Sequence, residues 1–355
     1  MLTLRFSLNV AGPSKALRMQ SQLLARNSFH STARTRAAAK PKVLLLDQIK
    51  LATTELNQLS KVATLVESTA KSRQELIEKF KSGGEYSDVV GIYRHFGGAR
   101  SVKITALSHR NVQASNVPTT VDYATSDVAL YLLLGALRRF PLAKAQMNEG
   151  KFNSAFPFLE ARDPRGKTLG VVGAGGIGRA FAYKASHALG IKVIYHNRNR
   201  LDKDVEAQAA RGGMQYVKSL NELLQQSDVV SLHCLLTPAT KGLIGRKQLE
   251  MMKKDAILLN TARGPIVKEE ELAQALEQGL TAGAGLDVFE AEPKIHDKLL
   301  ALKDTKVELP PPHVGTLTLE TQTEMEAVCL RNLIKALETG KLGFTVPEQR
   351  EVEFK

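Results

Sequence analysis

A glycine-rich turn between an apolar run and a helix-forming run is the feature that most restricts how this chain folds. Residues 167–196 read KTLGVVGAGGIGRAFAYKASHALGIKVIYH, in which Gly173, Gly175 and Gly178 satisfy the pattern GxGxxG. The first glycine permits a tight turn, the second lets the backbone approach a pyrophosphate, and the third lets helix and strand pack closely. The helix start offers free N–H groups to phosphates. Placed between a strand and a helix, the pattern predicts a dinucleotide site.

The residue that should hold the adenosine ribose is unusual. An Asp or Glu normally stands about 20 residues after the glycine turn, but here the sequence reads His196-Asn197-Arg198. A neutral amide at Asn197 removes the repulsion that a carboxylate would exert on a 2′-phosphate, and Arg198 or Arg200 can pair with that phosphate. The pattern favours NADP over NAD. In the alternative interpretation these arginines lie on a solvated face and NADH is accepted too.

Strand-like and helix-like segments alternate along the chain, which predicts parallel sheets. We expect strands at residues 42–47, 62–66, 88–93, 169–173, 192–196, 229–234, 256–262, 282–289 and 306–310. We expect helices at residues 53–62, 73–83, 124–140, 176–190, 220–227, 246–252, 270–279 and 318–339. The fold class is therefore α/β, with two doubly wound domains.

The net charge of +13 is concentrated before Asp47, where eight Lys and Arg residues occur without any acidic residue. Without those eight charges the remainder carries only +5, which does not indicate nucleic-acid binding. The chain also has no Trp that could stack on bases. The acid-free, Arg- and Ser-rich residues 1–41 predict a mitochondrial presequence outside the fold, hence a matrix location. The alternative is a disordered basic tail. No run reaches the roughly 18 apolar residues of a membrane span, and the spacing of Cys234 and Cys329 does not predict a metal site.

Three ionisable residues each follow a strand-like segment near its carboxyl end, where open α/β sheets bind ligands. They are Arg263 after residues 256–262, Glu292 after residues 282–289, and His313 after residues 306–310. Protonated His313 can donate a proton to a substrate carbonyl, Glu292 can orient it, and Arg263 can hold a carboxylate. Each taken alone also fits a structural role: a surface ion pair for Arg263, a loop acid for Glu292, and a cap for His313.

Several motifs in order resemble the D-isomer-specific 2-hydroxyacid dehydrogenase family, especially its glyoxylate and hydroxypyruvate reductases. They are VPTTVDYATSDVALYLLLGALRR, the glycine turn, DVVSLHCLLTPATKGLI, LLNTARGPIV, AGAGLDVFEAEP and PHVGT. The resemblance implies an NAD(P)H-dependent reductase of small 2-keto acids and a homodimer formed through the helix at residues 126–139. It implies that Arg263 orients the substrate, that Glu292 supports His313, and that His313 is the acid/base. It also implies cofactor contacts at Gly173, Gly175, Gly176, Ile177, Gly178, Asn197, Arg198, Cys234, Thr261, Ala262, Arg263, Asp287, His313 and Gly315.

The resemblance also implies the division of the chain. A cofactor-binding Rossmann domain at residues 119–316 is inserted in a flavodoxin-like catalytic domain made of residues 42–118 and 317–350. One departure is serious. Family members follow the strand matching residues 88–93 with a helix, a further strand and a loop resembling GAGYD that binds the substrate carboxylate. Here residues 94–111 leave room for a short helix only. Either the unit is truly deleted, or an exon was missed in the gene model. The alternative function is therefore an NAD(P)-binding, non-catalytic homologue.

Overall fold

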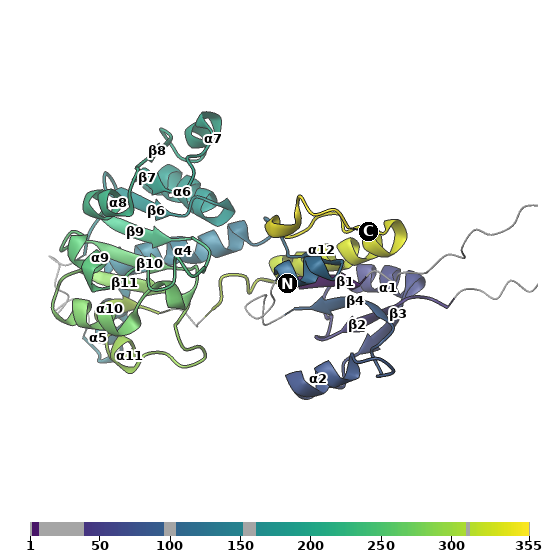
Figure 1. The fold of residues 1–355 in the computed structure, drawn as a ribbon. Coiled ribbons are helices and arrows are strands. Elements are labelled where there is room, and N and C mark those ends of the chain that lie inside the picture. The colour runs from purple at the N-terminus through teal and green to yellow at the C-terminus, as the bar shows by residue number, and fades with distance from the viewer. Residues whose placement is uncertain (1, 7–38, 96–103, 152–160, 310–312, 355) are drawn as a thin grey trace, which may run out of the picture. The chain divides into compact units, whose positions relative to one another are not determined.

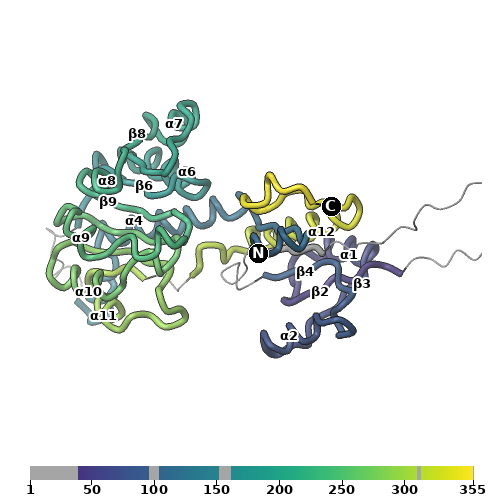
Figure 2. The backbone as a smooth tube through the Cα atoms, viewed as in Figure 1, coloured from purple at the N-terminus to yellow at the C-terminus, as the bar shows by residue number. Residues whose placement is uncertain are grey.

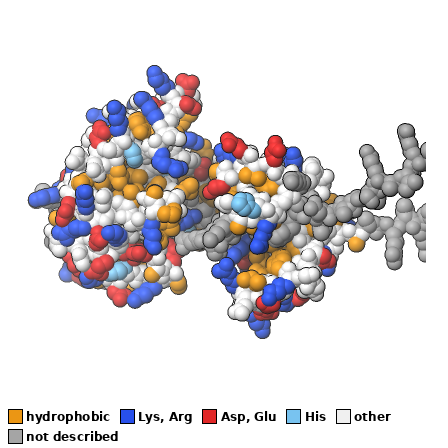
Figure 3. Space-filling model, in the orientation of Figure 1, with side chains coloured by type: hydrophobic (Ala, Val, Ile, Leu, Met, Phe, Trp, Pro, Cys, Tyr) orange, Lys and Arg blue, Asp and Glu red, His pale blue; other side chains and the backbone are white. Residues whose placement is uncertain are grey.

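The computed structural model describes residues 2–6, 39–95, 104–151, 161–309 and 313–354. Most of the predicted presequence, residues 7–38, lies outside the described residues. The chain forms two compact units: unit 1 comprises Met1–Val117 and Thr323–Lys355, and unit 2 comprises Pro118–Gln322. The purple N-terminal and yellow C-terminal segments both belong to unit 1 (Figure 2). On the visible face of each unit, Lys and Arg are interspersed with Asp and Glu (Figure 3).

Unit 2 is built on a seven-stranded sheet of order β12-β11-β10-β9-β6-β7-β8 (Figure 1). All neighbouring strands in it are parallel. The strands are β6 (Thr168–Val172), β7 (Lys192–His196), β8 (Met214–Tyr216), β9 (Val229–Leu232), β10 (Ile257–Asn260), β11 (Gly283–Leu286) and β12 (Val307–Glu308). The order reverses next to β6, and that reversal places the glycine turn at the switch point where doubly wound sheets bind nucleotides.

The two faces of this sheet are covered by different helices because side chains alternate along each strand. On β10, Ile257 and Leu259 join a core with α4 (Asp122–Arg138) and α6 (Gly176–Leu189). Leu258 faces the opposite core. That second core is formed with α8 (Leu220–Gln226), α9 (Arg246–Met251), α10 (Glu269–Glu277) and α11 (Asp297–Ala301). Two further short helices are α5 (Phe140–Asn148) and α7 (Lys203–Gln208). The predicted doubly wound cofactor domain is confirmed.

The sheet of unit 1 has the order β3-β2-β4-β1-β5. Its strands are β1 (Leu2–Phe6), β2 (Lys42–Leu45), β3 (Thr64–Glu67), β4 (Val89–Arg94) and β5 (Val112–Ser115). β2 is parallel to β3 and β4, whereas β1 runs antiparallel between β4 and β5. We expected residues 1–41 to lie outside the fold, and the structure corrects this for Leu2–Phe6. The backbone groups of β4 and β5 require partners, and β1 provides them.

Helices cover unit 1 on two faces as well. α1 (Thr53–Val62) and α12 (Leu319–Thr339) share a core with β2 and β4, while α2 (Arg73–Lys79) covers the other face. α3 (Ile104–His109) packs near the 3-10 turn Pro347–Gln349. The buried carboxylate of Glu326 on α12 accepts hydrogen bonds from the N–H groups of Leu51 (2.7 Å) and Ala52 (2.9 Å) at the start of α1. The end of the chain thus completes the part of unit 1 that is made first.

The elements missed from the sequence are short. β5, β8, α5, α7 and α11 have four, three, nine, six and five residues, too few for a clear periodic pattern. Among the described residues, no helix combines the length and the apolar character needed to cross a membrane.

Candidate active site

The predicted site residues follow six neighbouring strands of unit 2 and therefore gather at one edge of its sheet. The glycine turn follows β6, Asn197 follows β7, and Cys234 comes two residues after β9. Arg263, Asp287 and His313 follow β10, β11 and β12 in turn. Because these strands are parallel neighbours, their carboxyl ends lie along the same edge, which is the edge that binds ligands in open α/β sheets.

The three fingerprint glycines have different surroundings. Gly173 has φ +96°, and a Cβ there would lie 2.6 Å from the backbone nitrogen of Cys234. A Cβ on Gly178 would lie 2.4 Å from the carbonyl oxygen of Gly173. A Cβ on Gly175 would meet no protein atom within 4 Å. Space is thus kept open at the start of α6, where a pyrophosphate binds in such turns. These residues fit a dinucleotide.

Gly176 and Ile177 form the first turn of α6. A Cβ on Gly176 would overlap the carboxylate of Asp122, which belongs to the first turn of α4. Burial raises the pKa of Asp122, and the nearby charge of Arg179 partly opposes that rise. Gly176 therefore serves the packing of α4 on α6 as well as its predicted contact with the cofactor.

Asn197 is fastened to the glycine turn because its side-chain oxygen accepts a hydrogen bond from the N–H of Ala174 (2.8 Å). Arg200 is paired with Glu206 on α7 through two hydrogen bonds of 2.8 Å. Sequence reasoning treated Arg198 and Arg200 as equal candidates for a 2′-phosphate. The pairing with Glu206 removes that equivalence, and Arg198 is the better candidate. Glu206 was missed because it lies on the unforeseen helix α7.

His233, just before Cys234, is a residue of this edge that sequence reasoning did not single out. Its ring lies 2.8 Å from the hydroxyl of Ser231 through Nε2 and 3.3 Å from that of Thr261 through Nδ1. Burial lowers the pKa of His233 to about 3, so its ring is neutral at physiological pH. Burial also raises the pKa of the Cys234 thiol. These groups form an uncharged surface beside the glycine turn. The sequence signal that could have identified His233 is its place in the motif SLHC, directly before Cys234.

The structure joins two of the three predicted catalytic residues directly. The ring nitrogen Nδ1 of His313 lies 3.2 Å from Oε2 of Glu292. The other carboxylate oxygen, Oε1, accepts a hydrogen bond from the N–H of Phe289 (2.9 Å). Since a carboxylate only accepts hydrogen bonds, Nδ1 is the donor in this pair, and Nε2 is left to face a ligand. Half of the His313 side chain is exposed, against 22% for Glu292.

Buried Asp287 holds the backbone around His313. Its carbonyl accepts from the N–H of His313 (2.7 Å), and its carboxylate accepts from the N–H groups of Val314 (2.9 Å) and Gly315 (3.3 Å). Burial raises the pKa of Asp287, and the hydrogen bond from Val314 opposes that rise. His313 itself has φ +58°, a conformation uncommon for residues other than glycine. This fastening fixes the position of a strained residue.

Arg263 lies in the turn after β10, where the side-chain amide of Asn260 donates to the Arg263 carbonyl (3.1 Å) and accepts from Ala262 N–H (3.0 Å). The guanidinium donates to the Ala262 carbonyl (2.6 Å). The next residue, Gly264, lies against Phe289, because a Cβ on Gly264 would come within 1.9 Å of the backbone of Phe289. The turn that carries Arg263 thus packs against the segment that leads to Glu292.

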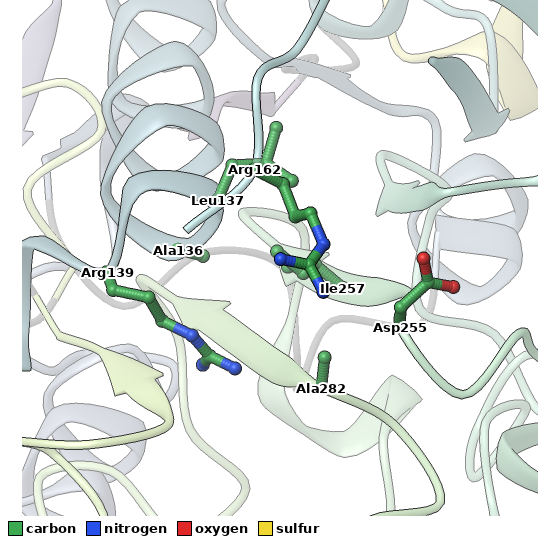
Figure 4. Close-up of a pocket in the computed structure, with 7 residues that line it drawn as sticks. All are labelled: Ala136, Leu137, Arg139, Arg162, Asp255, Ile257 and Ala282. Atoms are coloured by element: carbon green, nitrogen blue, oxygen red, sulfur yellow. The ribbon is translucent and has the colours of Figure 1, made fainter. Parts of the chain in front are cut away.

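A separate cavity of about 90 Å³ lies at the opposite, amino edge of the same sheet, beside the first residue of β10. Figure 4 shows the guanidinium groups of Arg139 and Arg162 and the carboxylate of Asp255 around it. Two of the sequence motifs end or begin at this edge, since Ala136, Leu137 and Arg139 close the motif of α4 and Ala282 opens AGAGLDVFEAEP. None of the predicted site residues lies there. Within the described residues, no group of three His, Cys, Asp or Glu side chains is arranged to hold a metal ion.

Comparison with known proteins agrees with this geometry. Residues 130–315 match the family described as D-isomer specific 2-hydroxyacid dehydrogenase, NAD binding domain. The chain is 37% identical over 340 residues to 4-methyl-2-oxopentanoate reductase A of Aspergillus oryzae, covering 88% of this chain and 99% of the relative. It is 34% identical over 297 residues to glyoxylate reductase 1 of Saccharomyces cerevisiae, covering 83% of this chain and 81% of the relative. The crystal structure of a glyoxylate reductase from Paecilomyes thermophila superposes with a TM-score of 0.80 at 38% identity, covering 88% of this chain and all of that one.

Proposed function

Because this chain belongs to the D-isomer specific 2-hydroxyacid dehydrogenase family, we propose that it reduces glyoxylate and hydroxypyruvate, with His313 as the proton donor. Membership makes it an NAD(P)-dependent oxidoreductase that interconverts 2-keto and 2-hydroxy acids. The choice of keto acid, the choice between NADP and NAD, and the role of each residue belong to the proposal.

The contact between His313 and Glu292 carries the proposal. A bound nicotinamide supplies the hydride that reaches the carbonyl carbon. Nε2 of His313 gives its proton to the carbonyl oxygen as charge develops there. Glu292 accepts the Nδ1–H bond at 3.2 Å, which fixes the orientation of the ring and leaves Nε2 for the substrate. Arg263 holds the carboxylate of the substrate with its fork of donors.

The preference for NADPH rests on the turn after β7. Asn197 replaces the expected acid and is turned towards Ala174, so no carboxylate of that residue repels a 2′-phosphate. Arg198 is the next residue and supplies the positive charge. We expect a lower KM for NADPH than for NADH, and Arg198→Gln should reduce that difference.

The names of three relatives suggest two substrate sizes. Glyoxylate reductase 1 of Saccharomyces cerevisiae and the Paecilomyes thermophila glyoxylate reductase are named for a two-carbon acid. The Aspergillus oryzae relative is named for 4-methyl-2-oxopentanoate, a branched acid. We favour the small acids, on the motif resemblance and on these two relatives. The branched acid is the second candidate. The competing class is a protein that binds NAD(P) without turnover, since the carboxylate loop resembling GAGYD is missing.

The test is steady-state oxidation of NADPH and NADH by the full chain with glyoxylate, hydroxypyruvate and 4-methyl-2-oxopentanoate. Cofactor binding is followed in parallel by fluorescence. Turnover that is fastest with glyoxylate or hydroxypyruvate supports the proposal, and a clear preference for the branched acid selects the second candidate. Cofactor binding without turnover of any acid contradicts the proposed reduction and supports the non-catalytic alternative.

Two further properties complete the proposal. We expect homodimers formed through the helix at residues 126–139, next to which the large apolar side chains of Tyr123, Phe140 and Met147 are exposed. Light scattering after gel filtration measures this directly, and a monomer at micromolar concentration contradicts it. We also expect a mitochondrial matrix location from the basic leader, which fractionation of cells with an antibody to the full chain tests.

A further inference from the structure

A hydrogen-bonded network surrounds the turn that carries Arg198. The hydroxyl of Tyr195 donates to Oε1 of Glu206 (2.5 Å) and accepts from the N–H of Leu201 (2.9 Å). Arg200 forms its two bonds with the same Glu206 carboxylate. The carboxylate is almost fully covered, with only 9% of its side chain exposed. Glu206 is therefore the common partner of a tyrosine at the end of β7 and an arginine in the turn.

The other side of the turn is held by Tyr216 of β8. Its hydroxyl donates to the carbonyl of Asn197 (3.4 Å), and its ring lies 5.8 Å from the guanidinium carbon of Arg200. Residues 197 and 201 are thus fastened by two tyrosines, and Arg200 between them by Glu206. Arg198 lies inside this fastened turn, and among the described residues the structure gives it no ion pair.

We propose that Glu206 is a positioning residue for the 2′-phosphate of NADPH. It holds Arg200 out of the phosphate site and fixes the turn, so that Arg198 alone meets the phosphate. This inference rests on the proposed NADPH preference. Glu206 touches neither cofactor nor substrate, and it acts through Arg200 and Tyr195.

Two charge-neutralising changes test the idea: Glu206→Gln and Arg200→Gln, with Glu222→Gln at an exposed position of α8 as a control. Each neutral variant breaks the ion pair and loosens the turn. Both should raise the KM for NADPH about tenfold, and both should leave kcat and the KM for NADH nearly unchanged. The double variant should resemble either single variant, because one interaction is lost in all three. Glu222→Gln should behave as wild type.

A different pattern of KM values is expected if Arg200 binds the phosphate directly. If Arg200 were itself a phosphate ligand, Glu206→Gln would release it and lower the KM for NADPH, while Arg200→Gln would raise that KM. Equal effects on both cofactors would show a merely structural role and would also overturn the inference. The ratio of NADPH to NADH efficiency in the wild type reports the proposed function separately from the variants. If Arg198 gives no preference for NADPH, the wild-type ratio will be close to one, and that result contradicts the proposed function before any variant is measured.

A second and independent inference concerns β1. Leu4 pairs with Ile92 of β4 on one side and with Ala114 of β5 on the other, and both ladders are antiparallel. Among the described strands, which have the order β3-β2-β4-β1-β5, β1 alone joins β5 to the rest of the sheet. Leu2–Phe6 therefore lies where the strand of the missing strand–helix unit would be expected.

The outer edge of β5 already has its partners. The side chain of Gln349 accepts from the N–H of Ala114 (2.7 Å) and donates to the carbonyl of Val112 (2.9 Å). The N–H of Val346 donates to the carbonyl of Ala114 (2.9 Å). β4 and β5 are buried along their length except for Arg94. Without β1, their facing edges would lose backbone partners at a buried position, which is costly.

We infer that Leu2–Phe6 is a constituent strand of the mature protein and that the basic leader is retained after folding. A leader removed at import would take this strand with it. The inference does not depend on the keto acid or the cofactor, because β1, β4 and β5 all belong to unit 1.

Hydrogen exchange by mass spectrometry on the full chain tests this inference. Leu4→Pro removes one ladder N–H from β1, a change that an inner strand does not tolerate. Leu17→Pro makes the same exchange elsewhere in the leader and serves as a control. Faster exchange at residues 89–94 and 112–115 in Leu4→Pro only, with cofactor binding by unit 2 unchanged, supports the inference. Failure of Leu4→Pro alone to fold supports it as well. Unchanged protection overturns it.

A chain lacking residues 2–38 provides a second measurement. It should exchange quickly at the same two segments, and a peptide of residues 1–10 added in trans should slow that exchange by adding a strand to the open edge. The same peptide with Leu4→Pro is the control. Full protection without any peptide, or the recovery from cells of a stable protein that begins after residue 38, contradicts retention of the leader.

Discussion

Alanine substitutions in the turn after β6 should separate the fold from cofactor binding, because its glycines differ in their surroundings. At Gly173 the left-handed backbone costs an alanine about 1–2 kcal/mol. The added Cβ would lie 2.6 Å from Cys234 N and 2.8 Å from Cys234 Cα, an overpacking worth roughly 1–3 kcal/mol. Gly173→Ala should therefore lower the free energy of unfolding of unit 2 by roughly 2–5 kcal/mol.

Gly175→Ala should do the reverse. The residue has φ −74° and no protein atom within 4 Å of an added Cβ, so the change in stability should stay within about 0.5 kcal/mol. The methyl group would enter the space of the pyrophosphate. If that overlap costs about 1–3 kcal/mol, the Kd for NADPH rises roughly 5- to 150-fold.

Two measurements decide the matter: urea unfolding of the apoprotein and fluorescence titration with NADPH. The unfolding transition of unit 2 is recognised because added cofactor shifts it. Gly166→Ala is the control for backbone conformation, since Gly166 has φ +76° but open space around an added Cβ, and it should cost only about 1–2 kcal/mol. Gly173→Ala as stable as wild type, or Gly175→Ala with unchanged NADPH affinity, would refute the reasoning.

Three further predictions concern the acid/base pair and the charged network. His313→Gln should lower kcat by roughly 10²- to 10⁴-fold and leave the Kd of the cofactor unchanged. Glu292→Gln should lower kcat less, because Glu292 supports His313 and does not donate the proton itself; equal losses in kcat would contradict this assignment. Asp287→Ala should leave the N–H groups of Val314 and Gly315 unpaired, the first part-buried and the second buried. It should cost roughly 2–5 kcal/mol of unfolding free energy, measured in urea, with a concurrent fall in kcat; normal stability would exclude the fastening role. The hydrogen bonds from Arg200 lower the pKa of Glu206 from 4.5 to about 2, so its stabilisation is complete above the unfolded value and is lost as the pH falls from 4.5 towards 2. The wild type should lose stability over that range more steeply than Glu206→Gln, and parallel pH profiles would contradict the pairing.

The parts of this molecule that sequence predicts well are those with long patterns and ordered motifs. β6, α6 and β7 follow from apolar runs around fixed glycines, and the positions of Glu292 and His313 after successive strands foretell their contact. The pairing of Arg200 was not predictable, because its partner lies on α7, a six-residue helix with no apolar period. β1 was missed for a different reason. Its residues belong to a basic, acid-free leader, and only the open edges of β4 and β5 give them a place in a sheet.

The capping of α1 by Glu326 has a consequence for how the protein folds during its synthesis. The carboxylate and the N–H group of Leu51 are 275 residues apart in sequence. Unit 2 ends at Gln322 and therefore leaves the ribosome before most of α12 does, so unit 2 can fold during synthesis as domains generally do. Unit 1 has to wait, with the start of α1 uncapped and the apolar face of β2 uncovered, until the last residues are made. All five described strands of its sheet have been made by then, but one apolar face is still uncovered, and a chaperone would most usefully bind the chain in that form.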